Sequence, residues 1–486
     1  MILASALFLR CFNINQSLWW DEIWSTLEYA AAPSWRTTVG SLGYYFNNHP
    51  LYSLLCRASL ALLGLSELSL RLPALVLGIA GVGACFVLRR YAGLTCAALT
   101  AALLAISSFH IDHSTEARGY SGLMLWAGLS SLFFLRALYR NQRADWCWCG
   151  VTTFLGCYTH VFMVAVTLTQ ITCLLLHWLG HAMAVPIIRR RVTAACRNGL
   201  TTFAATGLVT AIAYAPLLPE FIANLGKVRI VSVPRWPFLL ELADTIYPGI
   251  TTPAGLALYL PLIVIGAAAL VRTCSRRGCP VVALYALLLP LLPLLLYLAT
   301  NPMFVFTRYF IFALPACLLL PALGIATVAR GVRLSPHAHT LFCLIMLAAL
   351  CWIQLPAIST IVLHDRQNYR EAVALAESLP GTARIITIGH AGPHFRFYAK
   401  QDIVVPETFA EFQRLVRTKP AVCCLVSAWL PELRPPHEDR QLYAELPEHE
   451  RIYAYVRQHF THIKTYATRF PTHVYRSQPA APPAGV

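Results

Sequence analysis

The chain has 486 residues, of which 57% are hydrophobic and only 12% charged, and its formal net charge is +16. An ordinary soluble domain has about 25% charged residues. The composition therefore argues against a wholly soluble protein and indicates a polytopic membrane protein. No RNA-reading motif accompanies the positive charge, which argues against a nucleic-acid partner. The sixteen cysteines show neither a zinc-ligand spacing nor a disulfide framework, so no metal site is expected.

The first apolar segment, Met1 to Phe12, is short for a membrane span. As a helix it reaches ~18 Å, against ~30 Å of hydrocarbon. A cleavable signal peptide is not indicated, because no basic region precedes the segment and Asp21 and Glu22 follow it closely. We expect a truncated or misassigned start, with a full first helix that begins upstream in the cytoplasm.

A long loop is predicted next, over about residues 13–71, with its amphipathic pieces Tyr44–Phe46 and Leu51–Leu65 along the membrane interface. Ten apolar runs follow, mostly near the ~20 residues that a spanning helix needs. With the first segment they predict about 11 spans. The runs are 72–88, 95–110, 121–137, 147–163, 164–179, 199–216, 254–271, 280–299, 309–329 and 340–361.

The arginine distribution predicts the orientation, because basic residues in short loops stay in the cytoplasm. Alternate loops hold Arg89, Arg90, Arg136, Arg140, Arg143, Arg189, Arg190, Arg191, Arg197, Arg272, Arg276, Arg277, Arg330 and Arg333. Most acidic residues before position 360 fall in the other loops: Asp21, Glu22, Glu28, Glu67, Asp112, Glu116, Glu220, Glu241 and Asp244. Any catalytic site is therefore expected on the extracytoplasmic side.

The chain becomes charged after residue 362, which separates a transmembrane domain (1–362) from a soluble domain (363–477) and a disordered Pro/Ala tail (478–486). Alternating helices and strands predict a small α/β fold for the soluble domain. The expected helices are Tyr369–Leu379, Phe409–Thr418 and Glu448–Phe460, and the expected strands are Ala383–Gly389, Ala421–Ser427, His462–Tyr466 and Thr472–Arg476. An odd number of spans places this domain outside.

The motif Trp19-Trp20-Asp21-Glu22 is the leading candidate for chemistry. Ionisable groups at membrane depth are costly to bury, so they are functional candidates. A plainer interpretation is an aromatic belt at the interface, with two carboxylates that complement a helix N-terminus.

Four further candidates lie on the same predicted side, each with a structural alternative. His49 precedes Pro50, which is typical of a turn before an interfacial helix. Glu116 and Arg118 end one span, where a solvated helix end is the alternative; at i,i+2 spacing they do not pair on one helix face. Arg308 opens a span, where arginine often snorkels to the interface. His160 is the weakest of the four, because it also suits a hydrogen-bonded interface residue.

These residue types suit sugar transfer from a lipid phosphate. A base must accept the acceptor's hydroxyl proton, and cations must hold the phosphate charge that grows as the glycosidic bond breaks. The chain lacks a Walker A motif, a Rossmann glycine pattern and an Asp-x-Asp motif. A lipid-linked donor fits this absence of nucleotide-binding motifs.

The order of several short motifs resembles the GT-C glycosyltransferases, in particular the bacterial relatives of the protein O-mannosyltransferases and of the lipid A aminoarabinose transferase. The motifs are Trp20-Asp21-Glu22, His49-Pro50-Leu51-Tyr52, Arg71-Leu72-Pro73, Glu116-Ala117-Arg118-Gly119-Tyr120, Tyr158-Thr159-His160 and Arg308-Tyr309-Phe310 with Leu314-Pro315. The resemblance implies a mainly α GT-C helical bundle with a small extracytoplasmic α/β domain.

The resemblance also implies roles for individual residues. Asp21 would be the general base, and Glu22 would orient Asp21 or the acceptor. His49, Arg118 and Arg308 would contact the donor phosphate, and Glu116 would orient Arg118 or substrate. Tyr120, Tyr309 and His160 are further substrate-binding candidates.

The activity implied is inverting transfer of a hexosyl or pentosyl group from a polyprenyl-phosphate donor to a hydroxyl on a glycan, lipid or protein. No cofactor is expected, although a divalent cation stays open, and the expected location is a bacterial cytoplasmic membrane. The alternatives are a transporter or lipid-linked glycan flippase, and a polysaccharide polymerase or ligase. A transporter often has internal repeats, which the sequence does not show.

Overall fold

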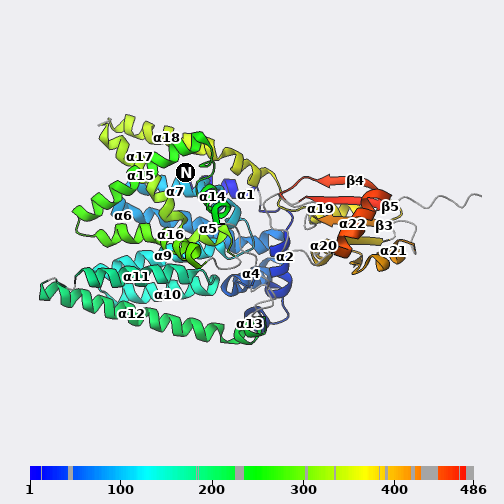
Figure 1. Cartoon of the computed structure of the whole chain (residues 1–486), viewed down its shortest axis with the longest axis horizontal. Helices are drawn as coiled ribbons and strands as arrows, with labels where there is room; N and C mark the ends of the chain where they lie inside the picture. The colour runs from blue at the N-terminus through cyan, green and yellow to red at the C-terminus, as the bar shows by residue number, and fades with distance from the viewer. Residues whose placement is uncertain are drawn as a thin grey trace, which may run out of the picture. The chain divides into compact units, whose positions relative to one another are not determined.

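The computed structural model describes residues 1–12, 14–41, 47–181, 183, 185–224, 235–300, 305–332, 335–382, 384–388, 392–417, 422–427, 447–469 and 471–477. The chain forms two compact units, and we describe each by itself (Figure 1). The helical unit holds Met1–Ile14 and most of the chain from Glu28 to Thr360. The α/β unit holds Asn15–Leu27 and the chain from Ile361 onward. The predicted segment Tyr44–Phe46 and the tail 478–486 lie outside the described residues.

The helical unit is built almost entirely from helices that are rich in apolar residues. Its α-helices are α1 (Ile2–Cys11), α3 (Trp35–Gly40), α4 (Pro50–Leu63), α5 (Glu67–Ala84), α6 (Arg89–Ala92), α7 (Leu94–Ile106), α8 (Ser108–Ser114), α9 (Tyr120–Arg140), α10 (Arg143–Thr159), α11 (Met163–Gly180), α12 (Pro186–Tyr214), α13 (Leu218–Asn224), α14 (Arg235–Ile246), α15 (Pro253–Arg276), α16 (Pro280–Thr300), α17 (Leu314–Gly331) and α18 (Pro336–Leu363). Short 3₁₀ or π turns are η1 (Thr26–Ala30), η2 (Cys85–Leu88), η3 (Ala215–Leu217) and η4 (Thr307–Ala313).

Among the residues that the structure describes, eight helices are long and apolar enough to cross a membrane, or nine if α7 and α8 form one bent span. All ten predicted apolar runs fall on helices. The expected number was about 11, and the difference lies in α1 and α10. These two helices have 10 and 17 residues, which is short for a span.

The chain bends by 63° between α7 and α8, and the buried side chain of Arg10 joins α1 to this region. Arg10 Nε donates to Ser114 Oγ at 2.6 Å, and Nη1 donates to the carbonyl of Ala105 at 3.1 Å. Its Nη2 lies 2.7 Å from His110 Nδ1. A buried guanidinium needs such partners, so Arg10 fixes α8, which leads directly to Glu116 and Arg118.

Two glycines allow α15 and α17 to approach at backbone distance. A Cβ on Gly266 would lie 1.8 Å from the carbonyl oxygen of Leu320, and one on Gly324 would lie 2.2 Å from that of Leu262. Small residues at a helix–helix interface permit this contact within a membrane. The contact supports α17. The turn η4, which carries Arg308, directly precedes this helix.

The α/β unit contains a five-stranded sheet of order β2-β1-β3-β5-β4. The strand β1 pairs in parallel with β2 and β3, whereas β5 pairs antiparallel with β3 and β4. Its elements are α2 (Trp20–Ser25), α19 (Tyr369–Ser378), β1 (Arg384–Ile388), α20 (Gly392–Tyr398), β2 (Ile403–Val404), α21 (Phe409–Arg417), β3 (Val422–Ser427), α22 (Pro447–His459), β4 (Phe460–Tyr466) and β5 (Thr472–Ser477).

The mainly α fold with a small C-terminal α/β region is confirmed. The three helices and four strands expected after residue 362 are all present within a few residues of their expected ends. The sequence reading omitted α20 and β2. Both are short, and α20 mixes aromatic and basic residues without a clear period, so neither produces a strong pattern.

Candidate functional site

His49 is held by the backbone of a distant loop. It is the N-cap residue of α4, and its Nδ1 accepts a hydrogen bond of 2.8 Å from the N–H of Gly119. Burial and the nearby Arg118, His160 and Arg308 lower the pKa of His49 well below its usual value. His49 is therefore neutral at pH 7, and because Nδ1 accepts, Nε2 bears the proton.

Arg118 places a second donor beside His49. Its Nη2 lies 3.2 Å from His49 Nε2, and Nη1 donates to the carbonyl oxygen of Asn47 at 3.1 Å. Nη2 also donates to the side-chain oxygen of Asn47. With the tautomer of His49 set by Gly119, the 3.2 Å contact joins two N–H donors. Two adjacent donors of this kind suit an anion such as a phosphate.

Two guanidinium groups lie close to the ring of Tyr120. Its side chain is fully buried, and the central carbons of Arg118 and Arg308 each lie 5.8 Å from the centroid of its ring. Cations at this distance are attracted to the electron-rich face of an aromatic ring. Two cations 190 positions apart in sequence (308 − 118) thus meet at one tyrosine.

Arg308 and Tyr309 lie on η4, and both are half-buried. The guanidinium of Arg308 lies 4.3 Å from the ring centroid of Phe306, and the ring of Tyr309 lies 5.1 Å from that of His160. The ring of Tyr309 also lies 6.4 Å from that of Tyr120. Aromatic rings therefore surround the cation of Arg308 and set its position.

His160 follows the end of α10 and is buried. Its Nδ1 accepts from the N–H of Phe162 at 3.1 Å, which leaves the proton on Nε2. Burial, Arg118 and Arg308 lower the pKa of His160 to about 3. Its ring centroid lies 4.7 Å from that of His49, so two neutral imidazoles stand side by side.

The buried carboxylate of Glu116 pairs with His113, whose Nδ1 lies 2.7 Å from Oε2 of Glu116. The ring of His113 in turn lies 4.8 Å from that of Tyr120. His113 was not among the candidate residues, although its i,i+3 spacing from Glu116 is a usable signal. We call His49, His113, Glu116, Arg118, Tyr120, His160, Arg308 and Tyr309 the basic cluster.

Gly119 allows its own loop to approach His49 and Thr159 closely. A Cβ at this position would lie 2.8 Å from both His49 Nδ1 and Thr159 Cγ2. The backbone angles of Gly119 suit any residue (φ −79°, ψ 9°), so space and not conformation requires glycine here. The motif Glu116–Tyr120 contains this glycine, but its role is visible only in three dimensions.

This close approach predicts a sharp effect for Gly119→Ala. The added methyl group must displace His49 or Thr159, and a misplacement of about 1 Å can cost roughly 100-fold in rate. We expect a loss of about 10-fold to 100-fold in turnover. The matched control is Gly128→Ala on α9, where a Cβ meets nothing within 4 Å. Equal turnover of the two purified variants would contradict a role for the His49–Gly119 contact.

Asp21 and Glu22 lie on α2 within the α/β unit, and both are buried. Oε2 of Glu22 accepts from the N–H of Trp19 at 3.2 Å, so Glu22 caps its own helix. Asp21 is 9% exposed. The roles of Asp21 as general base and Glu22 as its support remain predictions.

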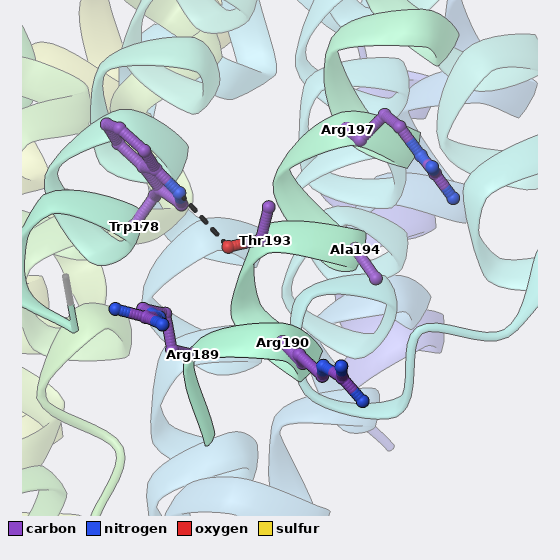
Figure 2. A pocket seen from close by; sticks show the side chains of 6 residues that line it. All are labelled: Trp178, Arg189, Arg190, Thr193, Ala194 and Arg197. Carbon is purple, nitrogen blue, oxygen red and sulfur yellow. Dashed lines mark hydrogen bonds between the residues drawn. The ribbon is translucent and has the colours of Figure 1, made fainter. Parts of the chain in front are cut away.

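A pocket of about 430 Å³ lies elsewhere on the helical unit (Figure 2). Its lining residues are Trp178, Arg189, Arg190, Thr193, Ala194 and Arg197. Figure 2 shows Arg189 pointing to one side, and Arg190 and Arg197 to the other. These exposed arginines belong to the predicted cytoplasmic loops, and no candidate residue lines the pocket.

In the described part of the chain, no group of three or more His, Cys, Asp or Glu could hold a metal ion.

Part of the chain is similar to a known protein family. Residues 47–190, less than a third of the chain, match the family model for dolichyl-phosphate-mannose-protein mannosyltransferases. The matched region contains His49, Glu116, Arg118, Tyr120 and His160. No curated protein sequence matches the chain at a significant level.

Solved structures resemble the whole chain. ArnT from Cupriavidus metallidurans in the apo state matches with a TM-score of 0.57 and 14% identity, over 97% of each chain. The same protein bound to undecaprenyl phosphate gives 0.55 and 13% identity, over 98% of this chain and 97% of that one. The oligosaccharyltransferase AglB from Archaeoglobus fulgidus, with an inhibitory peptide and a dolichol-phosphate, gives 0.50 and 12%, over 87% and 69%. The GT-C fold that the motifs predict is thereby confirmed.

Proposed function

We propose that this protein is an inverting glycosyltransferase that moves a sugar from a polyprenyl-phosphate donor to a hydroxyl acceptor on the extracytoplasmic side of a membrane. The observation that carries the proposal is the pair of guanidinium groups, from Arg118 and Arg308, on the ring of the buried Tyr120. Similarity to structures that hold undecaprenyl phosphate and dolichol-phosphate supports the class of donor.

The basic cluster binds the donor phosphate. Arg118 and Arg308 supply full positive charges, and the Nε2–H groups of His49 and His160 add neutral donors. Buried, preoriented donors stabilise a developing negative charge more strongly than water does, because they need no reorganisation during the reaction. The phosphate acquires that charge as the leaving group.

Asp21 acts as the general base. The acceptor hydroxyl oxygen attacks the anomeric carbon, and its proton passes to the Asp21 carboxylate. The new carbon–oxygen bond forms as the bond to the phosphate oxygen breaks, and polyprenyl phosphate leaves with the electron pair. One displacement inverts the anomeric centre. Arginine side chains meet the charge of the leaving phosphate in this reaction.

Deletion of the gene in its host tests the proposed function. Lipid extracts of the deletion strain should accumulate a polyprenyl-phosphate sugar, and one envelope glycan, lipid or protein should lose that sugar. Wild-type protein should reverse both changes, and the Asp21→Asn variant should reverse neither. An unchanged lipid profile with an unchanged envelope would contradict sugar transfer. Accumulation of the lipid on the cytoplasmic face alone would indicate a flippase.

A further inference from the structure

The segment that carries Asp21 is built into the same compact unit as the C-terminal chain, from which it is separated by more than 300 residues. The N–H of Trp20 donates to Oε1 of Gln367 at 2.8 Å. The N–H of Leu18 donates to the hydroxyl of Tyr398, also at 2.8 Å. Side chains of the C-terminal chain thus bind the backbone on the N-terminal side of Asp21.

A second set of bonds holds the start of the segment. Nη1 of Arg370 donates to the carbonyl oxygen of Asn15 at 3.1 Å, and the N–H of Arg370 donates to Ser17 Oγ at 3.3 Å. The guanidinium carbon of Arg366 lies 4.9 Å from the ring centroid of Trp19. Residues 15–20 are therefore bound along their whole length.

A further contact is a ring stack on the residue before Asp21. The ring of His394, on α20, lies 3.8 Å from that of Trp20 with an interplanar angle of 21°. The ring of Trp24, on the next turn of α2, lies 6.3 Å from His394 at 23°. His394 is only 1% exposed, and its ring also lies 6.0 Å from that of Tyr369. Stacked rings contribute stability and also fix orientation.

The helix α2 has six residues and continues into the five residues of η1, and together they are still fewer than the ~12–15 residues that an isolated helix needs to be stable in water. Glu22 caps it from within, but nothing in six residues alone determines where Asp21 points. A catalytic carboxylate must be held to about 0.5 Å by packed neighbours. The bonds from Gln367 and Tyr398 and the stack on His394 supply that support.

We infer that the C-terminal α/β domain is the positioning element for the catalytic base, with His394 acting through Trp20 to fix Asp21. This inference rests on the proposed function of Asp21. It gives the domain a role in turnover that is separate from acceptor recognition. His394 acts by its ring contact and not by proton transfer.

Variants of the full-length protein at His394 test this role, with the lipid extract of the deletion strain as donor. His394→Ala removes the ring, whereas His394→Phe keeps a flat ring without nitrogen atoms. We expect His394→Ala to lower kcat about 10-fold to 100-fold with little change in KM. His394→Phe should restore kcat to within about threefold of wild type. The matched control is His462→Ala, because His462 is an exposed histidine on β4 that bonds Thr465.

Hydrogen exchange gives a readout that does not depend on activity. Peptides that cover residues 15–27 should exchange faster in His394→Ala than in wild type, because the N–H groups of Leu18 and Trp20 lose protection. His394→Phe and His462→Ala should leave them protected. If His394→Ala fails to fold, Tyr398→Phe replaces it, since it removes the hydroxyl that accepts from the Leu18 N–H and keeps the ring. It should then raise exchange at Leu18 and lower kcat several-fold.

A double variant separates positioning from other roles. On an Asp21→Asn background, His394→Ala should cost less than about twofold, because asparagine has no base function left to misplace. If the fold-losses of the two single variants multiplied in the double variant, the inference would be overturned. It would also be overturned if His394→Phe lowered kcat as much as His394→Ala does. Wild-type kcat in both His394→Ala and Tyr398→Phe would also overturn it. The Asp21→Asn variant alone tests the proposed function. Near-normal turnover in that variant would contradict the role of Asp21 as general base, but it would leave the contacts of His394 and Tyr398 with residues 15–20 untouched.

Discussion

Replacement of Asp21 by asparagine should slow sugar transfer by about 10²–10⁴-fold, the range attributed to general-base assistance. Asparagine keeps the size of the side chain but cannot accept the acceptor's proton. The fall should appear in kcat at saturating donor, with donor binding almost unchanged. Single-turnover transfer by purified full-length protein measures it.

Two neighbouring carboxylates serve as controls for this effect. Glu28→Gln changes an exposed carboxylate seven residues away and should leave turnover within about twofold of wild type. Glu22→Gln should impair turnover less than Asp21→Asn, because the amide oxygen can still accept from the Trp19 N–H. Near-normal transfer by well-folded Asp21→Asn would show that another group takes the proton.

Removal of Arg118 or Arg308 should be the second large effect. Each alanine variant should lose about 10²–10³-fold in turnover, as expected when one donor to a developing anion is removed. Arg118→Lys and Arg308→Lys should recover only part of the loss, since lysine supplies charge without the planar, two-pronged donor of arginine. The matched control is Arg190→Ala, in the exposed pocket of Figure 2.

Kinetics as a function of donor concentration distinguish the two possible roles of these arginines. Phosphate ligands should change both donor affinity and kcat, because the contact strengthens as the phosphate gains charge. If neither alanine variant altered donor binding or turnover, both arginines would be interface anchors and the basic cluster would not be a phosphate site.

Much of the architecture could be predicted from the sequence because membrane helices produce a strong signal. Every predicted apolar run lies on a helix, and the α/β elements after residue 362 follow the expected order. Four of the short motifs converge in the helical unit: His49 is bound to Gly119, Arg308 lies beside Tyr120, and the ring of His160 lies 4.7 Å from that of His49. Order along the chain was a sufficient guide there, since all these motifs are predicted on the same side of the membrane.

Other features could not be read from the sequence, because they depend on contacts between distant segments. Nothing local in Trp20 or His394 reveals that they stack, and α20 was too short to predict. The pairing of His113 with Glu116 was also missed. Its i,i+3 spacing permits a contact, but Glu116 lies past the end of α8, where helical spacing is a weaker guide. The proximity of Asp21 to the basic cluster remains a prediction of the mechanism.

Binding of undecaprenyl phosphate to the purified full-length protein tests the central claim most directly, with undecaprenol as the matched lipid that lacks the phosphate. Titration in lipid nanodiscs should show that wild type prefers the phosphate at least about 100-fold, since charge-assisted bonds contribute roughly 1.5–3 kcal/mol each. The Arg118→Ala/Arg308→Ala double variant should lose that preference, whereas Arg190→Ala should keep it. Equal preference for the phosphate in wild type and the double variant would show that the donor phosphate binds elsewhere.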